Sequence, residues 1–179
     1  MIRAGRAALA ATGLAALLAA CATPTPEPAV PAFDTAAAVR AVRAAGEADA
    51  KELSVQPLRD PQVEDLRQDA AALEARGMVQ GAADALDRAL AITPDDPALL
   101  QERAEVALLL GDTATAAQLA TRAFDLGSQV GPLCRRHWET LAQIRLATPV
   151  PAEGAPVAAS VEEARERRDA CTVAPPPRF

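Results

Sequence analysis

The chain has 179 residues, which is enough for one domain. Its formal net charge is −6 and only 2% of its residues are aromatic, which argues against nucleic-acid binding because such proteins carry basic patches. The same acidity gives no attraction to anionic lipid headgroups, so a membrane location would need an anchor of another kind.

Residues 1–20 have the features of a bacterial export signal. Arg3 and Arg6 precede an uninterrupted run of small and apolar residues, Ala7 to Ala20. This run is too short for a transmembrane helix, which needs about 20 apolar residues. A positive flank followed by a short apolar stretch and small residues is typical of a secretory signal. An Ala-rich first helix of a soluble domain is the alternative interpretation.

The end of this stretch, Leu18-Ala19-Ala20-Cys21, resembles the lipobox of bacterial lipoproteins. The resemblance implies that a peptidase removes residues 1–20 and that Cys21 then carries the lipid. Bacterial lipoproteins usually carry several acyl chains, and two suffice for stable anchoring. By the sorting habit of that family, Ala22 favours the outer membrane. We therefore expect a lipid-anchored protein of the cell envelope, on the periplasmic face of the outer membrane.

Residues 21–32 read as a proline-rich tether, with the segment ATPTPEPAVP after the cysteine. Such segments favour polyproline II and rise about 3.1 Å per residue, so ten residues reach roughly 30 Å. The domain is therefore expected to work close to its membrane. Residues 33–60 form the next segment, in which Phe33 to Leu53 is Ala-rich and compatible with a helix that Gly46 weakens.

An internal repeat follows, with a period of 34 residues. When the two units are aligned, Gly77 matches Gly111, Ala82 matches Ala116 and Ala89 matches Ala123. Two short helices and two turns occupy about this length, and small residues let paired helices approach closely. Asp60-Pro61 and Asp96-Pro97 each offer an N-cap followed by proline at the first helical position.

This pattern resembles the tetratricopeptide repeat (TPR) family over residues 61–171. The third unit departs from it: Cys134, Trp138 and Leu141 occupy the core positions of its first helix, and a proline-rich loop replaces the turn glycine. Ser160 to Glu163 then form a capping box that begins another helix. The predicted fold is all-α, a short α-solenoid of two to three TPR-like hairpins with a preceding helix, and residues 172–179 form a disordered tail. A plain Ala-rich helical bundle is the alternative.

Cys134 and Cys171 are the two remaining cysteines. In an antiparallel hairpin the start of the first helix lies beside the end of the second, and an exported chain meets an oxidising compartment. This placement predicts a disulfide. Two free thiols are the alternative, and a metal site that adds His137 is a weaker one because structural zinc needs four ligands.

No catalytic signature stands out in the sequence, and we expect neither an enzyme nor a bound metal or cofactor. There is no nucleophile elbow, phosphate-binding glycine loop or zinc-protease motif. His137 is the only histidine, and its place on a packed helix beside Trp138 favours a structural role.

The TPR resemblance implies a binding groove along the inward side of the first helix of each unit. Carried over by position, the groove residues would be Glu64, Arg67, Gln101, Glu105, Arg135, Glu139 and Gln143. Their mixed polarity suits a protein or peptide partner in the cell envelope, and Arg67 and Arg135 are expected to contribute more to binding than to folding. The lysine and asparagine clamp of some family members is absent. A solvated face without ligand, in a structural or self-associating envelope protein, is the alternative.

Overall fold

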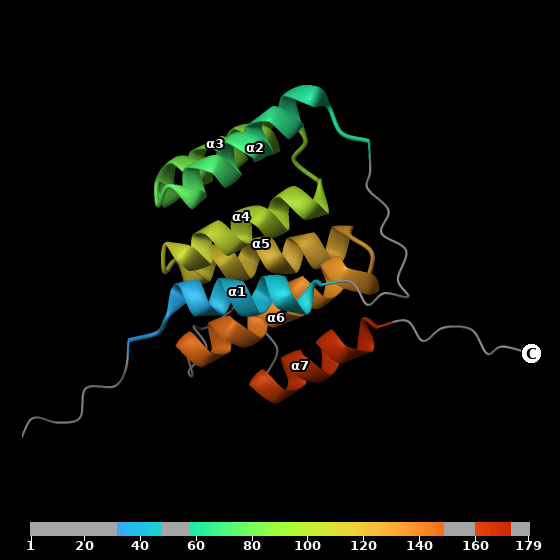
Figure 1. Ribbon diagram of the computed structural model, residues 1–179. Coiled ribbons are helices and arrows are strands. Elements are labelled where there is room, and N and C mark those ends of the chain that lie inside the picture. Colours follow the sequence, from blue (N-terminus) through green and yellow to red (C-terminus); the bar gives the residue numbers. More distant parts are fainter. Residues whose placement is uncertain (1–31, 48–57, 149–159, 173–179) are drawn as a thin grey trace, which may run out of the picture. The chain divides into compact units, whose positions relative to one another are not determined.

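In the computed structural model of this chain, residues 32–47, 58–148 and 160–172 are described. They form helices only, as predicted, and none is long and apolar enough to cross a membrane. In chain order (Figure 1) the helices are α1 (Thr35–Ala45), α2 (Pro61–Ala75), α3 (Val79–Ile92), α4 (Pro97–Leu109), α5 (Thr113–Leu126), α6 (Gly131–Ala147) and α7 (Val161–Ala170). The predicted signal peptide, Cys21 and all but the last residue of the tether lie outside the described residues, as do most of the proline-rich loop and 173–179 of the tail.

The helices after α1 form three successive hairpins, which stack in chain order from the top of Figure 1. Helix α2 packs on α3, α4 on α5 and α6 on α7, while α3 contacts α4 and α5 contacts α6. The third hairpin, for which the repeat pattern was weakest, is therefore present.

The first helices of the first two hairpins, α2 and α4, begin at the predicted aspartate caps and end just before the predicted turn glycines. Asp60 and Asp96 cap α2 and α4, each accepting a backbone N–H at 2.8 Å, and proline follows each of them. Gly77 and Gly111 have φ values of 76° and 78°, a left-handed conformation that residues with a Cβ adopt at a cost. Each ends the first helix of its hairpin.

The repeated alanines form the closely packed seams of the first two hairpins. Ala82, Ala89, Ala116 and Ala123 are all at most 1% exposed. Larger apolar side chains, such as Leu86 in the first hairpin, fill the space on either side of the seams. Burial of such side chains is the main stabilising term, about 25 cal/mol for each Å² of apolar surface removed from water.

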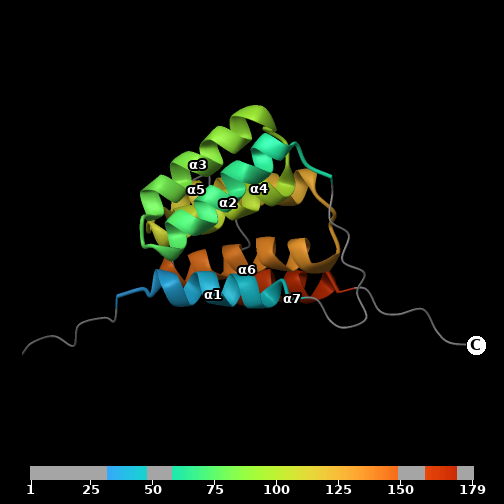
Figure 2. The ribbon, with the colours of Figure 1, turned by 45° about the horizontal axis from the view of Figure 1, so that its top comes forward.

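Helix α1 covers the first helices of the second and third hairpins. It contacts α6 and α4, and Figures 1 and 2 show it running beside α6. Its buried side chains are Ala38, Val39 and Val42. The helix ends at Ala45, with Gly46 as its C-cap, and is thus shorter than the stretch from Phe33 to Leu53 that the composition allowed.

The third hairpin is closed by the disulfide between Cys134 and Cys171, whose Cα atoms lie 5.8 Å apart. This confirms the pairing predicted from the hairpin. Ser160 is the N-cap of α7, and its hydroxyl accepts the N–H of Glu163 at 3.0 Å. Ala164 is the buried side chain of α7, and the disulfide, the ion pair between Arg168 and Glu139 and the contact of Arg167 with the Trp138 ring join this helix to α6.

Candidate binding groove

Most of the residues predicted to line a groove are buried instead. Five of the seven are no more than 8% exposed: Gln101, Glu105, Arg135, Glu139 and Gln143. The prediction of an open groove along all three hairpins is wrong for Gln101, Arg135, Glu139 and Gln143, because α1 covers α4 and α6 and because α7 also contacts α6. Glu105 is buried but still lines the groove that remains. Glu64 and Arg67, on the first hairpin, remain accessible, with side-chain exposures of 40% and 21%.

Arg135 has a structural role, in contrast to the binding role expected from its position. Its guanidinium donates to the carbonyl oxygens of Ala45 at 2.9 Å and Glu47 at 3.2 Å. These carbonyls lie at and just beyond the C-terminal end of α1, where a cation also interacts favourably with the helix dipole. Arg135 thus holds α1 on α6. Glu139 is likewise engaged, accepting from Arg168 of α7 at 2.7 Å.

A buried polar network joins α4 to α6. The side-chain amide of Gln101 donates to Glu105 and to Thr140, both at 2.9 Å. Its carbonyl oxygen lies 2.6 Å from Nδ1 of His137, so Nδ1 carries the proton. Burial, assisted by the nearby charge of Arg136, lowers the pKa of His137 to about 3. The imidazole is therefore neutral at physiological pH.

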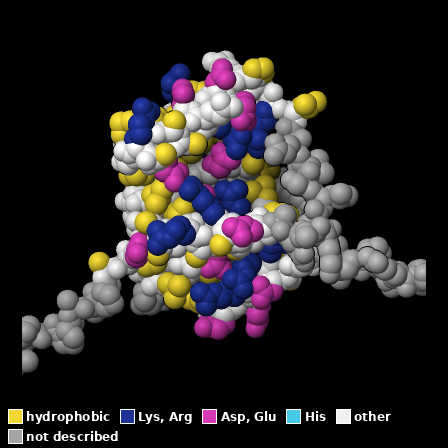
Figure 3. All heavy atoms as spheres, viewed as in Figure 1, with side chains coloured by type: hydrophobic (Ala, Val, Ile, Leu, Met, Phe, Trp, Pro, Cys, Tyr) yellow, Lys and Arg dark blue, Asp and Glu magenta, His cyan; other side chains and the backbone are white. Residues whose placement is uncertain are grey.

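An open groove remains between α2 and α4, with a volume of about 530 Å³. The apolar part of its lining, which we call the floor, consists of Ala70, Ala71, Ala75, Leu86 and Val106, of which Ala71 and Ala75 are exposed. Its rim is charged, and Figure 3 shows basic and acidic side chains interleaved on the face between α2 and α1. We call this feature the α2–α4 groove. A volume between about 300 and 1,000 Å³ is typical of ligand sites.

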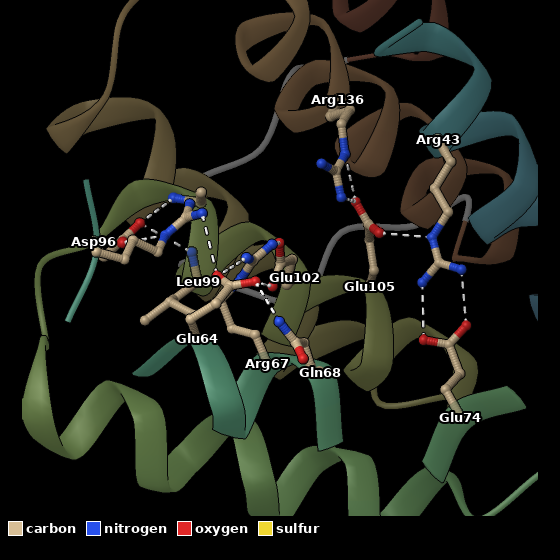
Figure 4. A network of polar contacts seen from close by, with 12 residues as sticks. Arg43, Glu64, Arg67, Gln68, Glu74, Asp96, Leu99, Glu102, Glu105 and Arg136 are labelled. Carbon is tan, nitrogen blue, oxygen red and sulfur yellow. Dashed lines mark hydrogen bonds and ion pairs between the residues drawn. The ribbon is translucent and has the colours of Figure 1, made fainter. Parts of the chain in front are cut away.

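A cluster of ion pairs in the lining of the α2–α4 groove draws on four helices (Figure 4). Arg43 of α1 donates to both carboxylate oxygens of Glu74 on α2, at 2.8 and 2.9 Å, and to Glu105 on α4 at 3.0 Å. Arg136 of α6 approaches Glu105 from the other side, at 2.5 and 2.9 Å. The bonds to Glu74 are the main reason that the pKa of Arg43 is raised, and Glu105 adds to it.

The absence of a side chain at Gly46 makes this cluster possible. A Cβ at that position would come within 2.4 Å of Cδ of Arg136. Glycine at the end of α1 therefore lets Arg136 pass beside the backbone and reach Glu105.

A second cluster lies on the rim at Arg67, where one guanidinium serves two carboxylates. Arg67 donates to Glu64 at 2.7 Å and, through Nε, to Glu102 at 2.8 Å. A second hydrogen bond also joins Arg67 to Glu102. Gln68 also donates to Glu64, at 3.3 Å. The hydrogen bond from Arg67, with a further contribution from Gln68, lowers the pKa of Glu64. Arg59 contacts Glu64 only at 4.0 Å and pairs with Asp96.

The lining of the α2–α4 groove suits recognition by ion pairs and hydrogen bonds. It contains three arginines and four glutamates, a balance of 3 − 4 = −1. Among the described residues there is no cluster of three or more metal-ligating side chains. The arrangement can therefore hold a polar or charged segment over an apolar floor.

The sequence did not predict four of the charged lining residues, Arg43, Glu74, Glu102 and Arg136, or the polar Gln68. Glu102 directly follows the predicted Gln101, so an inner helix face taken one residue wider would have included it. Arg43 and Arg136 meet only because α1 docks beside α6, and no local pattern marks that contact.

No protein-family profile and no curated protein matches this chain. Among solved structures it is similar to the globular C-terminal domain of LpoP from Pseudomonas aeruginosa, with 29% sequence identity and a TM-score of 0.54. The match covers 63% of this chain and 99% of that domain. The chain thus contains a helical domain similar to nearly all of the LpoP domain.

Proposed function

We propose that this protein is a non-catalytic scaffold of the cell envelope, whose α2–α4 groove binds a segment of a partner protein. The observation that carries the proposal is the groove itself: an apolar floor with a charged rim, left open where α1 does not reach. A floor of small side chains accommodates the apolar residues of a partner, and the rim supplies directed hydrogen bonds.

Two further observations support a scaffold. The 34-residue spacing and the hairpins resemble TPR domains, which commonly act as binding scaffolds. The similar LpoP domain has the same all-helical character. Fold alone does not define function, so the proposal depends on the groove.

We further propose that lipid on Cys21 anchors the protein in the membrane, on the periplasmic face. The support is the lipobox-like sequence that ends at Cys21. In a Cys21→Ala variant the precursor should remain uncleaved by the lipoprotein peptidase and should incorporate no labelled fatty acid. Wild-type protein that is unlipidated and found only in the soluble fraction would contradict this part of the proposal.

The groove is tested by photo-crosslinking in intact cells. A photoreactive residue replaces Ala71, an exposed position on the groove floor, and in a matched control it replaces Glu166, an exposed position on α7. We expect a covalent complex with one defined protein from position 71 and not from position 166. A product with the mass of two copies of this chain would favour self-association instead. Absence of any product specific to position 71 would refute the groove as the binding surface.

A further inference from the structure

Helix α1 shows how another helix can pack on the first helices of these hairpins, because it packs on α4 and α6. It places Ala38, Val39 and Val42 against the core, each at most 2% exposed. At its end Arg43 reaches between α2 and α4 to bridge Glu74 and Glu105. Helix α1 therefore binds the surface of α4 and α6 through small apolar side chains and, at its end, through an arginine.

The α2–α4 groove offers the same chemistry beside α1. Its floor is apolar, like the surface that α1 covers, and the charged groups that α2, α4 and α6 contribute to its lining are acidic in sum. Two arginines, Arg67 and Arg136, face four glutamates, a balance of 2 − 4 = −2, and Arg43 of α1 reduces the balance to −1.

The remaining negative charge is located at the Arg67 cluster. Glu74 and Glu105 pair with two arginines, whereas Glu64 and Glu102 share Arg67. Arg59 lies 4.0 Å from Glu64 but is closer to its other partner, Asp96, at 3.3 Å. Glu64 is also accessible, with a side-chain exposure of 40%. An additional cation can therefore approach this pair from the open side of the groove.

We infer that the partner segment is a helix that lies in the α2–α4 groove with small apolar residues on the floor and an arginine directed at Glu64 and Glu102. The arrangement repeats that of α1, with the partner's arginine in the role that Arg43 has between Glu74 and Glu105. An arginine suits this position because its planar fork can donate to two carboxylates at once. The inference rests on the proposed function and specifies the chemistry of the partner.

The test uses the full chain in detergent micelles and two synthetic Ala-rich helical peptides. One peptide carries arginine at two positions on one face, and the other carries glutamate at the same positions. Fluorescence polarisation should show saturable binding of the arginine peptide that weakens as salt is added. The glutamate peptide should bind at least about fivefold more weakly, as expected for one partly exposed ion pair. Equal affinities, or a preference for the glutamate peptide, would overturn the inference.

Charge variants locate the contact. Glu64→Gln keeps a hydrogen-bond acceptor for Arg67 and should weaken binding of the arginine peptide about fivefold. Glu166→Gln, on the exposed surface of α7, makes the same change in net charge and should leave binding unchanged. Glu64→Lys should reverse the preference toward the glutamate peptide. If both glutamine variants bind alike, the charge of the chain as a whole attracts the peptide and the assigned contact is wrong.

The outcome is separable from that of the proposed function. A specific crosslink from position 71 without any preference for the arginine peptide would leave the scaffold standing and reject the assigned partner chemistry. Thermal unfolding of each variant shows whether a loss of binding reflects loss of fold.

Discussion

The buried His137 should make the stability of the domain depend on pH. Its side chain is fully buried, and its pKa falls from the ordinary 6.5 to about 3. Because the unfolded state binds a proton near pH 6.5 and the folded state does not, the unfolded state is favoured as the pH falls. The stabilising contribution is complete above about pH 6.5 and is lost progressively between about pH 6.5 and pH 3.

The size of the effect follows from the difference between the two pKa values. A pH of 5 is about 1.5 units below the pKa of the unfolded side chain, whereas the folded side chain is still neutral at this pH. This difference lowers the free energy of unfolding by about 2 kcal/mol. Carboxylates with depressed pKa values, such as Glu64 and Asp112, lose their contribution only below their ordinary values of 4.5 and 3.8. The interval from about pH 7 to pH 5 therefore reports mainly on His137.

Urea unfolding at several pH values measures this dependence, with His137→Asn as the matched variant. Asparagine can donate to Gln101 as Nδ1 does, but it does not titrate. We expect the free energy of unfolding of the wild type to fall by about 2 kcal/mol between pH 7 and pH 5, and that of the variant to stay nearly constant. Equal slopes for the two proteins would refute the reasoning.

Three other perturbations test the attachments that hold the helices together. Replacing Cys134 and Cys171 by serine should lower the free energy of unfolding by about 4 kcal/mol, from the loop that the disulfide closes. Urea unfolding of the oxidised and reduced protein provides a second measure. Glu105→Ala removes the buried carboxylate that Arg43 and Arg136 share and should cost about 1 to 3 kcal/mol, because Arg43 keeps Glu74 and both arginines are partly exposed, whereas Glu166→Ala at an exposed site should change stability by less than about 0.5 kcal/mol. Asp96→Ala removes the N-cap of α4 and should cost about 1 kcal/mol; an unchanged melting temperature would show that this cap is dispensable.

The sequence by itself determined the helices, their hairpins and the disulfide. An aspartate before proline begins a helix, and a glycine free to adopt a positive φ ends one, through contacts within a few residues. The 34-residue spacing placed the alanine seams, because each hairpin packs mainly on its own residues. Cys134 and Cys171 lie far apart in the chain, yet the hairpin alone brings them together.

Only the tertiary structure decided which part of the inner surface stays open. The sequence of a helix of small residues such as α1 does not indicate which surface of the protein the helix will cover. The docking of α1 brings Arg43 onto Glu105, and it gives Arg135, which was expected to bind a partner, the role of capping the end of α1. Arg43 and Glu105 are 62 positions apart. Whether such polar side chains face solvent or one another depends on contacts between distant segments, which local patterns do not encode.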